Sequence, residues 1–90
     1  QEMMAKNPET TLIDVRSKQE YEEGHLPGSK LICLYDLEKQ ATNILQNKKQ
    51  NIIVYCSSGN RSKEAQEILE AMGYENVYNL KGGLDEINLY

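Results

Sequence analysis

Residues 51–61 read NIIVYCSSGNR, and this stretch decides the fold. Its first half, residues 51–55, is apolar on both faces, as the central strand of a parallel sheet is. Its second half is a turn of small residues that begins with Cys56. Residues 62–72 predict a helix, because apolar side chains recur there at helical spacing: Ala65, Ile68, Leu69 and Met72. We therefore expect a buried strand, a tight turn and a helix in direct succession.

Short apolar runs and amphipathic runs alternate on both sides of this stretch. Strands are predicted over residues 11–15, 31–34 and 76–80, and helices over residues 18–23 and 36–47. Because helices separate the strands, the connections between strands are crossovers. The sequence thus predicts an α/β fold, with a small parallel sheet of four to five strands and helices on both faces.

Several residues are expected to fix the ends of these helices. Ser17 and Glu20 have the spacing of a capping box, and Asp36 can cap the helix that follows it. Gly24 and Gly73 are expected to end helices in the left-handed conformation. The helix after Asp36 should bury one apolar face, made of Leu37, Ala41, Ile44 and Leu45.

The composition fits one domain that spans residues 1–90. Ninety residues leave room for one hydrophobic core, and a chain that is 39% hydrophobic and 27% charged is neither collagen-like nor disordered nor membrane-spanning. The net charge of −4 disfavours a nucleic acid or an anionic membrane as partner. The chain is predicted to close with a tight turn at residues 81–83 and a short helix or extension over residues 84–90.

Cys56 lies where parallel α/β sheets bind ligands, beyond the carboxyl end of a central strand. We expect its sulfur to be within reach of solvent, with the backbone N–H groups of the turn curled round it. The positive end of the next helix should lower its pKa. The turn supplies the candidate binding residues, which are Ser57, Ser58, Gly59, Asn60 and Arg61. The alternative interpretation is a buried structural cysteine in an ordinary loop.

The only two arginines in the sequence, Arg16 and Arg61, are both expected at this edge of the sheet. Each could bind an oxyanion through its planar guanidinium, or could anchor its own loop by pairing with Asp14 or a nearby glutamate. Anchoring is the favoured role for Arg16. Glu20 and its neighbouring glutamates are interpreted as a solvated helix face. Supporting roles at the site are assigned to Asp14, Arg16 and Ser62.

Three motifs give the chain a resemblance to a known family. They are residues 12–16 (LIDVR) with 24–29 (GHLPGS), residues 53–62 (IVYCSSGNRS), and residues 73–84 (GYENVYNLKGGL). In this order and spacing the motifs resemble those of rhodanese-like domains, over residues 12–87. Because residues 82–87 carry no tryptophan, the chain resembles in particular the small single-domain sulfurtransferases of the phage shock protein E type.

The resemblance implies a sulfurtransferase of the thiosulfate sulfurtransferase (rhodanese) type. The Cys56 thiolate would attack the outer sulfur of thiosulfate, or of a persulfide or polysulfide donor, and would keep that sulfur as a persulfide. Cyanide, a thiol or a sulfur-accepting protein would then remove it. The N–H groups of the turn would hold the charged persulfide. Neither a cofactor nor a metal is expected.

The length of the turn distinguishes sulfur transfer from the hydrolysis of phosphate esters. Four residues lie between Cys56 and Arg61, one fewer than in the phosphatases that resemble this fold, so hydrolysis of phosphate esters is disfavoured. Ser57 stands where many active relatives carry Arg or Lys. This departure predicts a lower activity with thiosulfate than with a neutral persulfide donor.

Two residues outside the turn have two interpretations each. His25, the only histidine, is expected to hydrogen-bond within its own loop rather than to act as a base. Cys33 is expected to be a small core residue rather than a resolving thiol, because in the family's sheet order its strand does not adjoin the Cys56 turn.

Two other functions remain open for the chain as a whole. It could be a non-catalytic rhodanese-like binding module, or a carrier that passes sulfur from protein to protein. The cytoplasm is the expected compartment, because a persulfide survives best where thiols stay reduced, and an extracytoplasmic location is the alternative.

Overall fold

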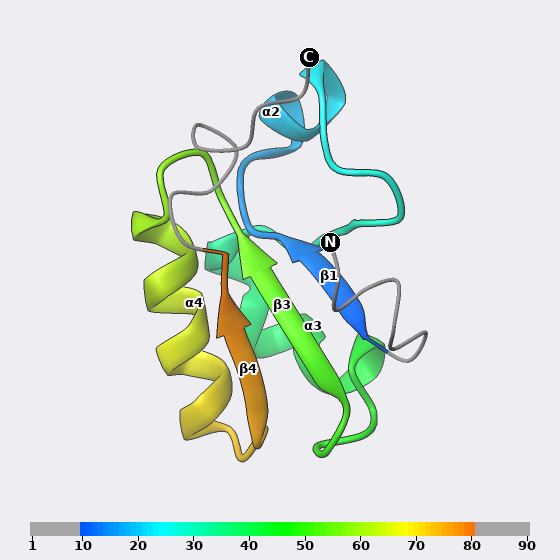
Figure 1. Ribbon diagram of the computed structural model, residues 1–90, viewed down its shortest axis with the longest axis vertical. Helices are drawn as coiled ribbons and strands as arrows, with labels where there is room; N and C mark the ends of the chain where they lie inside the picture. The colour runs from blue at the N-terminus through cyan, green and yellow to red at the C-terminus, as the bar shows by residue number, and fades with distance from the viewer. Residues whose placement is uncertain (1–9, 81–90) are drawn as a thin grey trace.

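The computed structural model describes residues 10–80, which form a four-stranded parallel sheet. The strand order is β2-β1-β3-β4. The bounds of the strands are β1 Thr11–Asp14, β2 Lys30–Leu31, β3 Asn51–Tyr55 and β4 Asn76–Asn79. All three pairings are parallel, which confirms the predicted α/β fold class. In Figure 1 the arrowheads of β1, β3 and β4 point to the same end of the molecule.

The helices connect these strands in the order that the sequence predicts. They are α2 (Lys18–Glu23), the short 3₁₀ helix η1 (Leu34–Asp36), α3 (Leu37–Ile44) and α4 (Asn60–Ala71). The predicted capping box is present at α2, where Ser17 and Glu20 bond reciprocally. Figure 1 shows α2 beyond the carboxyl ends of the strands. The segment that contains α2 therefore lies at the edge where the chemistry is expected.

Both faces of β3 are buried, and this explains its uninterrupted apolar sequence. On one face Ile52 and Val54 pack with α3 and α4 in the larger core cluster. On the other face Ile53 and Tyr55 pack with Leu26, from the loop after α2, and with Leu80, which follows β4. The Tyr55 hydroxyl accepts a hydrogen bond from the Leu26 amide and donates one to Ser29 Oγ, each at 3.0 Å.

The segment around β2 differs from the prediction. The expected strand over residues 31–34 is only two residues long, because the backbone turns at Cys33, whose carbonyl accepts from the Asp36 amide at 2.8 Å. The Asp36 side chain makes no capping hydrogen bond, although it stands at the N-cap of α3. Ile44 lies at the rim of the apolar face and is 37% exposed, since α3 ends at this residue.

The two predicted glycine caps have different outcomes. Gly73 has a φ of 101° and follows α4 in the left-handed region, as predicted. The prediction for Gly24 is wrong: its φ is 160° and its backbone is extended, because α2 ends with the Gly24 amide bonded to the Tyr21 carbonyl and the chain leaves directly.

Two further predictions concern the C-terminal segment and the absence of a membrane span. The predicted turn at residues 81–83 and the closing segment over residues 84–90 lie outside the described residues. Within residues 10–80, no helix has the length and apolar character needed to cross a membrane.

Candidate active site

Cys56 follows β3, between the carboxyl ends of β1 and β4, and its side chain is surrounded by hydrogen-bond donors. The Gly59 amide donates to Sγ at 3.0 Å, and the Ser62 amide lies 3.4 Å from it. The Ser62 hydroxyl oxygen also lies 3.4 Å from Sγ. The amide groups are thus turned toward the sulfur, as expected. The expectation of solvent access is wrong, because the loop closes over the sulfur and leaves Cys56 fully buried.

Two opposing effects set the acidity of this thiol. Burial raises the pKa of Cys56, because it removes water from the thiolate. The Ser62 hydroxyl and the amides of Ser62, Gly59 and Ser58 donate hydrogen bonds that favour the thiolate. Together these bonds outweigh burial, and the pKa of Cys56 lies below its ordinary value.

Gly59 gives the loop the shape that brings these donors to the sulfur. It stands at the N-cap of α4 with a φ of 97°, in the left-handed region that costs other residues about 1–2 kcal/mol. This conformation points its N–H at Cys56 and lets α4 begin at Asn60, two residues earlier than predicted. The buried Ser62 therefore lies in the first turn of α4, at the positive end of its dipole.

The side chains of Ser57, Ser58 and Asn60 make their hydrogen bonds away from the sulfur. Ser57 is half-buried, and its hydroxyl lies 3.5 Å from Glu20 Oε2. Ser58 and Asn60 are exposed, and the Asn60 side-chain amide donates to the Ser58 hydroxyl at 3.3 Å. Hydrogen bonds between exposed side chains thus hold the solvent side of the turn, and the amide bonds to Cys56 Sγ hold its buried side.

Arg61 forms a bidentate ion pair with Glu20. Its two terminal nitrogens lie 2.8 and 2.9 Å from the two carboxylate oxygens. Hydrogen bonding to Arg61 holds the pKa of Glu20 well below its usual range, and the pair raises the pKa of Arg61. The ion pair is the anchoring contact considered for Arg61, and it joins α2 to α4, so Glu20 does not lie only on a solvated face. The attraction of a substrate by Arg61 stays a prediction.

Arg16 forms a second, buried ion pair with Asp14. Arg16 Nε lies 3.0 Å and its terminal nitrogen 2.7 Å from the two oxygens of Asp14. The same terminal nitrogen donates to the Gly24 carbonyl, just after α2. This pair anchors the segment between β1 and α2, which is the role favoured for Arg16.

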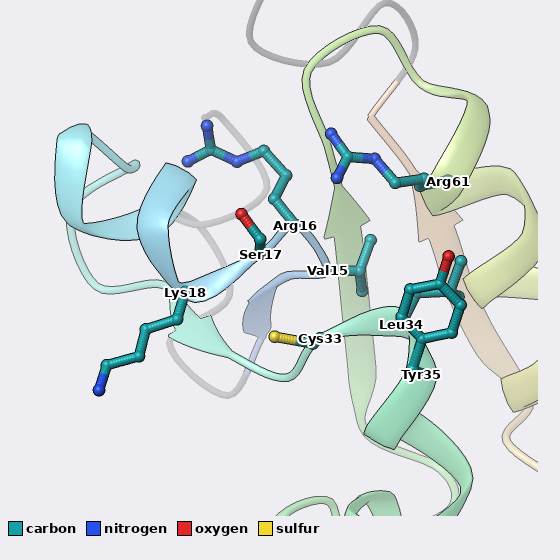
Figure 2. Close-up of a pocket in the computed structure, with 8 residues that line it drawn as sticks. All are labelled: Val15, Arg16, Ser17, Lys18, Cys33, Leu34, Tyr35 and Arg61. Carbon is teal, nitrogen blue, oxygen red and sulfur yellow. The ribbon is translucent and has the colours of Figure 1, made fainter.

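His25 makes its contacts within its own loop, and Cys33 lines a pocket. His25 Nδ1 lies 2.7 Å from the Tyr21 carbonyl oxygen and its ring stacks on Tyr21 at 3.7 Å, so this histidine is used within its own loop. Cys33 is only half-buried, because the chain turns out of the sheet there. It lines a pocket of about 160 Å³ between the segments after β1 and β2 and the start of α4 (Figure 2). The pocket is lined by Val15, Arg16, Ser17, Lys18, Cys33, Leu34, Tyr35 and Arg61.

Asn79 is a site residue that the sequence analysis missed. It ends β4, next to the carboxyl end of β3, and its side chain bonds both to Ser62 Oγ and to the Gly59 carbonyl. The only signal in the sequence is a polar residue at the end of a strand predicted to share this edge. The sequence indicated Glu20 as a capping residue of α2. Its ion pair with Arg61 could not be predicted, because it forms only when α2 lies near the start of α4.

The comparison with known proteins agrees with this geometry. A family model described as the rhodanese-like domain matches residues 1–89. The chain therefore belongs to the rhodanese-like family.

Individual relatives fall into two groups. The chain is 37% identical to the thiosulfate sulfurtransferase PspE of Escherichia coli over 75 residues, which cover 83% of this chain and 71% of PspE. It is 33% identical over 87 residues to the tRNA uridine(34) hydroxylase of Photorhabdus laumondii, covering 92% of this chain. The chain spans only about a quarter of that hydroxylase (25%).

Solved structures give the same assignment of fold. A rhodanese with anions from E. coli matches with a TM-score of 0.82 and 34% identity, over 90% of this chain and 94% of that one. A rhodanese-like domain from Anabaena matches with a TM-score of 0.79 and 35% identity, over 83% and 85% of the two chains. These matches confirm the rhodanese-like fold of the chain.

Proposed function

We propose that this protein is a sulfurtransferase that carries a sulfane sulfur as a persulfide on Cys56. The observation that carries the proposal is the placement of one thiol, with a lowered pKa, among N–H donors at the carboxyl end of the central strand. Such donors stabilise a thiolate before the reaction and a charged sulfur after it. The similarity to PspE, which is named a thiosulfate sulfurtransferase, supports the same activity.

The reaction proceeds in two half-reactions on the same sulfur. In the first, the Cys56 thiolate attacks the outer sulfur of the donor; the new bond joins Sγ to that sulfur, and the donor's sulfur–sulfur bond breaks. The electron pair of the broken bond leaves on the rest of the donor, which is sulfite when the donor is thiosulfate. In the second, the acceptor attacks the outer sulfur and Cys56 departs as a thiolate, so the kinetics are ping-pong.

The surrounding residues favour both ionic states of this cycle. The amides of Gly59 and Ser62 hold the thiolate and need no general base, because the pKa is already lowered. Burial of Cys56 keeps water away from the persulfide and limits its loss to side reactions. The same burial means that a donor reaches the sulfur only when the loop over it moves.

The charges near the loop bear on the choice of donor. Arg16 and Arg61 are each paired with a carboxylate, and Ser57 adds no charge beside the nucleophile. A doubly charged donor such as thiosulfate therefore meets little net attraction at this edge. We propose that organic persulfides, which carry at most one charge, are better donors than thiosulfate, and that a thiol or a protein cysteine is the acceptor.

Intact-mass measurement tests the proposal. The protein is incubated with thiosulfate or with polysulfide, and the Cys56→Ser and Cys33→Ser variants are treated alongside it. We expect the wild type and Cys33→Ser to gain one sulfur atom, lost on addition of cyanide, and Cys56→Ser to gain none. A protein that takes up no sulfur from either donor is not a sulfurtransferase, and one that loads sulfur but does not release it to cyanide is a carrier.

A further inference from the structure

The side chain of Asn79 reaches across from β4 to two groups that contact the sulfur of Cys56. Its Nδ2 donates to the Gly59 carbonyl at 3.2 Å, and its Oδ1 accepts from the Ser62 hydroxyl. The end of β4 is fixed beside β3, because the Leu80 amide donates to the Val54 carbonyl at 2.9 Å. Asn79 is therefore held in place by the sheet while its amide contacts the loop.

The hydrogen bonds determine which way round this amide lies. Only the Nδ2 group can donate to the Gly59 carbonyl, so Oδ1 must face Ser62. The opposite orientation would place two acceptor oxygens against each other at Gly59. Asn79 therefore offers Ser62 an acceptor.

Counting protons shows that Ser62 cannot satisfy all its neighbours at once. Its hydroxyl has one hydrogen, and three acceptors lie round it: Asn79 Oδ1, the Gly59 carbonyl oxygen at 3.2 Å and Cys56 Sγ at 3.4 Å. The contact with Asn79 Oδ1 is the shortest of the three. When the hydrogen lies there, Ser62 Oγ is left as an acceptor toward the sulfur, and this suits a neutral S–H group.

We propose that Asn79 is a positioning residue that controls the protonation of Cys56 through the Ser62 hydroxyl. With Cys56 neutral, the S–H group donates to Ser62 Oγ and the Ser62 hydroxyl donates to Asn79. When Cys56 ionises, the Ser62 hydroxyl rotates and donates to the thiolate, and Asn79 loses that donor. Asn79 thus competes with the thiolate for one hydrogen and holds Cys56 less acidic than the loop alone would make it.

Other charged groups near the site do not account for such a competition. Arg61, on α4, is paired with Glu20 on α2, and Arg16 is paired with Asp14 at the end of β1. Guanidinium–carboxylate pairs do not change their charge near the ordinary pKa of a thiol. An effect of Asn79 on sulfur transfer rests on the proposed function. In the persulfide the charge lies on the outer sulfur and Sγ is neutral, so a hydrogen bond that favours neutral Sγ also favours the persulfide.

A titration of Cys56 in four proteins tests the proposal: the wild type, Asn79→Leu, Ser62→Ala and the double variant. The thiolate is followed by its ultraviolet absorbance as the pH is varied. The absorbance of the matching Cys56→Ser variant is subtracted from that of each protein, which cancels the contributions of the tyrosines and of Cys33. We expect Asn79→Leu to lower the apparent pKa of Cys56 when Ser62 is present. In the Ser62→Ala background we expect the same change to give no lowering.

Two results would overturn the proposal. One is an unchanged or raised pKa in Asn79→Leu, and the other is an equal lowering with and without the Ser62 hydroxyl. If Asn79→Leu does not fold by circular dichroism, Asn79→Ala removes the same two bonds without added bulk and is compared in the same way. The titration uses no sulfur donor, so its outcome is independent of the mass experiment that tests sulfur transfer.

Discussion

At the scale of single residues, the acidity of Cys56 depends on a balance between burial and hydrogen bonds. The side chain has no exposed surface, which alone would favour the neutral thiol. Ser62 stabilises the thiolate through two groups, its hydroxyl and its amide, whereas Gly59 and Ser58 each donate through the amide alone. The buried serine, rather than either arginine, is thus the main partner of the sulfur.

The first prediction follows from this role of Ser62. Replacement Ser62→Ala removes the hydroxyl that donates to the thiolate, so the pKa of Cys56 should rise and the pH profile of sulfur uptake should move to higher pH. The matched control is Ser58→Ala, because the exposed Ser58 hydroxyl contacts Asn60 and not the sulfur. Titration of the thiol checks both variants, and an equal pKa in Ser62→Ala and wild type would contradict the assignment.

The second prediction concerns Ser57. Replacement Ser57→Arg adds a positive charge beside the candidate nucleophile, and we expect faster uptake of sulfur from thiosulfate, by about tenfold, with a smaller gain for a singly charged organic persulfide donor. Steady-state rates at low and high salt check it, because an electrostatic gain is screened by salt. A gain that is the same for both donors would show that charge is not the cause.

At the scale of secondary-structure elements, two ion pairs determine how the loops at this edge are held. Arg61 ties the first turn of α4 to α2, and Arg16 ties the end of β1 to the segment just after α2. α2 is only six residues long and buries none of them. Its position therefore depends on these polar contacts more than on apolar packing.

The pair between Arg61 and Glu20 predicts a dependence of stability on pH. The pKa of Glu20 is lowered in the folded protein, so the pair stabilises the fold above the ordinary carboxyl value near 4.5, and that stabilisation is lost as the pH falls below it. The melting temperatures of wild type and Glu20→Gln should differ at neutral pH and converge in acid. Glu22→Gln, an exposed change in the same helix, should show no such trend, and a constant gap for Glu20→Gln would refute the prediction.

The left-handed residue at the start of α4 predicts a loss of stability. Replacement Gly59→Ala forces a side chain into a φ of 97° and should cost about 1–2 kcal/mol of unfolding free energy. Gly24→Ala is the matched control, because that backbone is extended and a Cβ there meets no atom within 4 Å. Urea denaturation measures both, and equal stabilities of the two variants would contradict the argument.

At the scale of the whole molecule, the sheet and the position of Cys56 could be predicted from the sequence, because both follow from local patterns. The apolar run of β3 and the small residues after it are adjacent in the chain. The partners of Arg61 and Asn79, and the pocket beside Cys33, could not be predicted, because each joins segments far apart in sequence. The burial of the sulfur was also not visible, since it depends on how tightly the loop closes.

The different surroundings of the two thiols predict their reactivity in the native protein. Cys33 is half-buried and lines a pocket, whereas Cys56 is fully buried. A maleimide attached to a large polymer should label Cys33 in the folded protein and Cys56 only after denaturation, as read from gel shifts. Cys33→Ser should then resist labelling in its native state, and rapid labelling of that variant would show that the loop is open.

Tyr55 and Cys56 are neighbours in sequence, yet they belong to opposite layers of the molecule. The tyrosine hydroxyl holds the Leu26 segment on one face of the sheet, while the cysteine lies on the face that α3 and α4 cover. Tyr55 thus fixes the Leu26 segment and Cys56 carries the candidate reactive sulfur. The alternation of side chains along the strand places the two on opposite faces of the sheet. Substitutions in the Leu26 segment are therefore expected to leave the hydrogen bonds to the Cys56 sulfur unchanged.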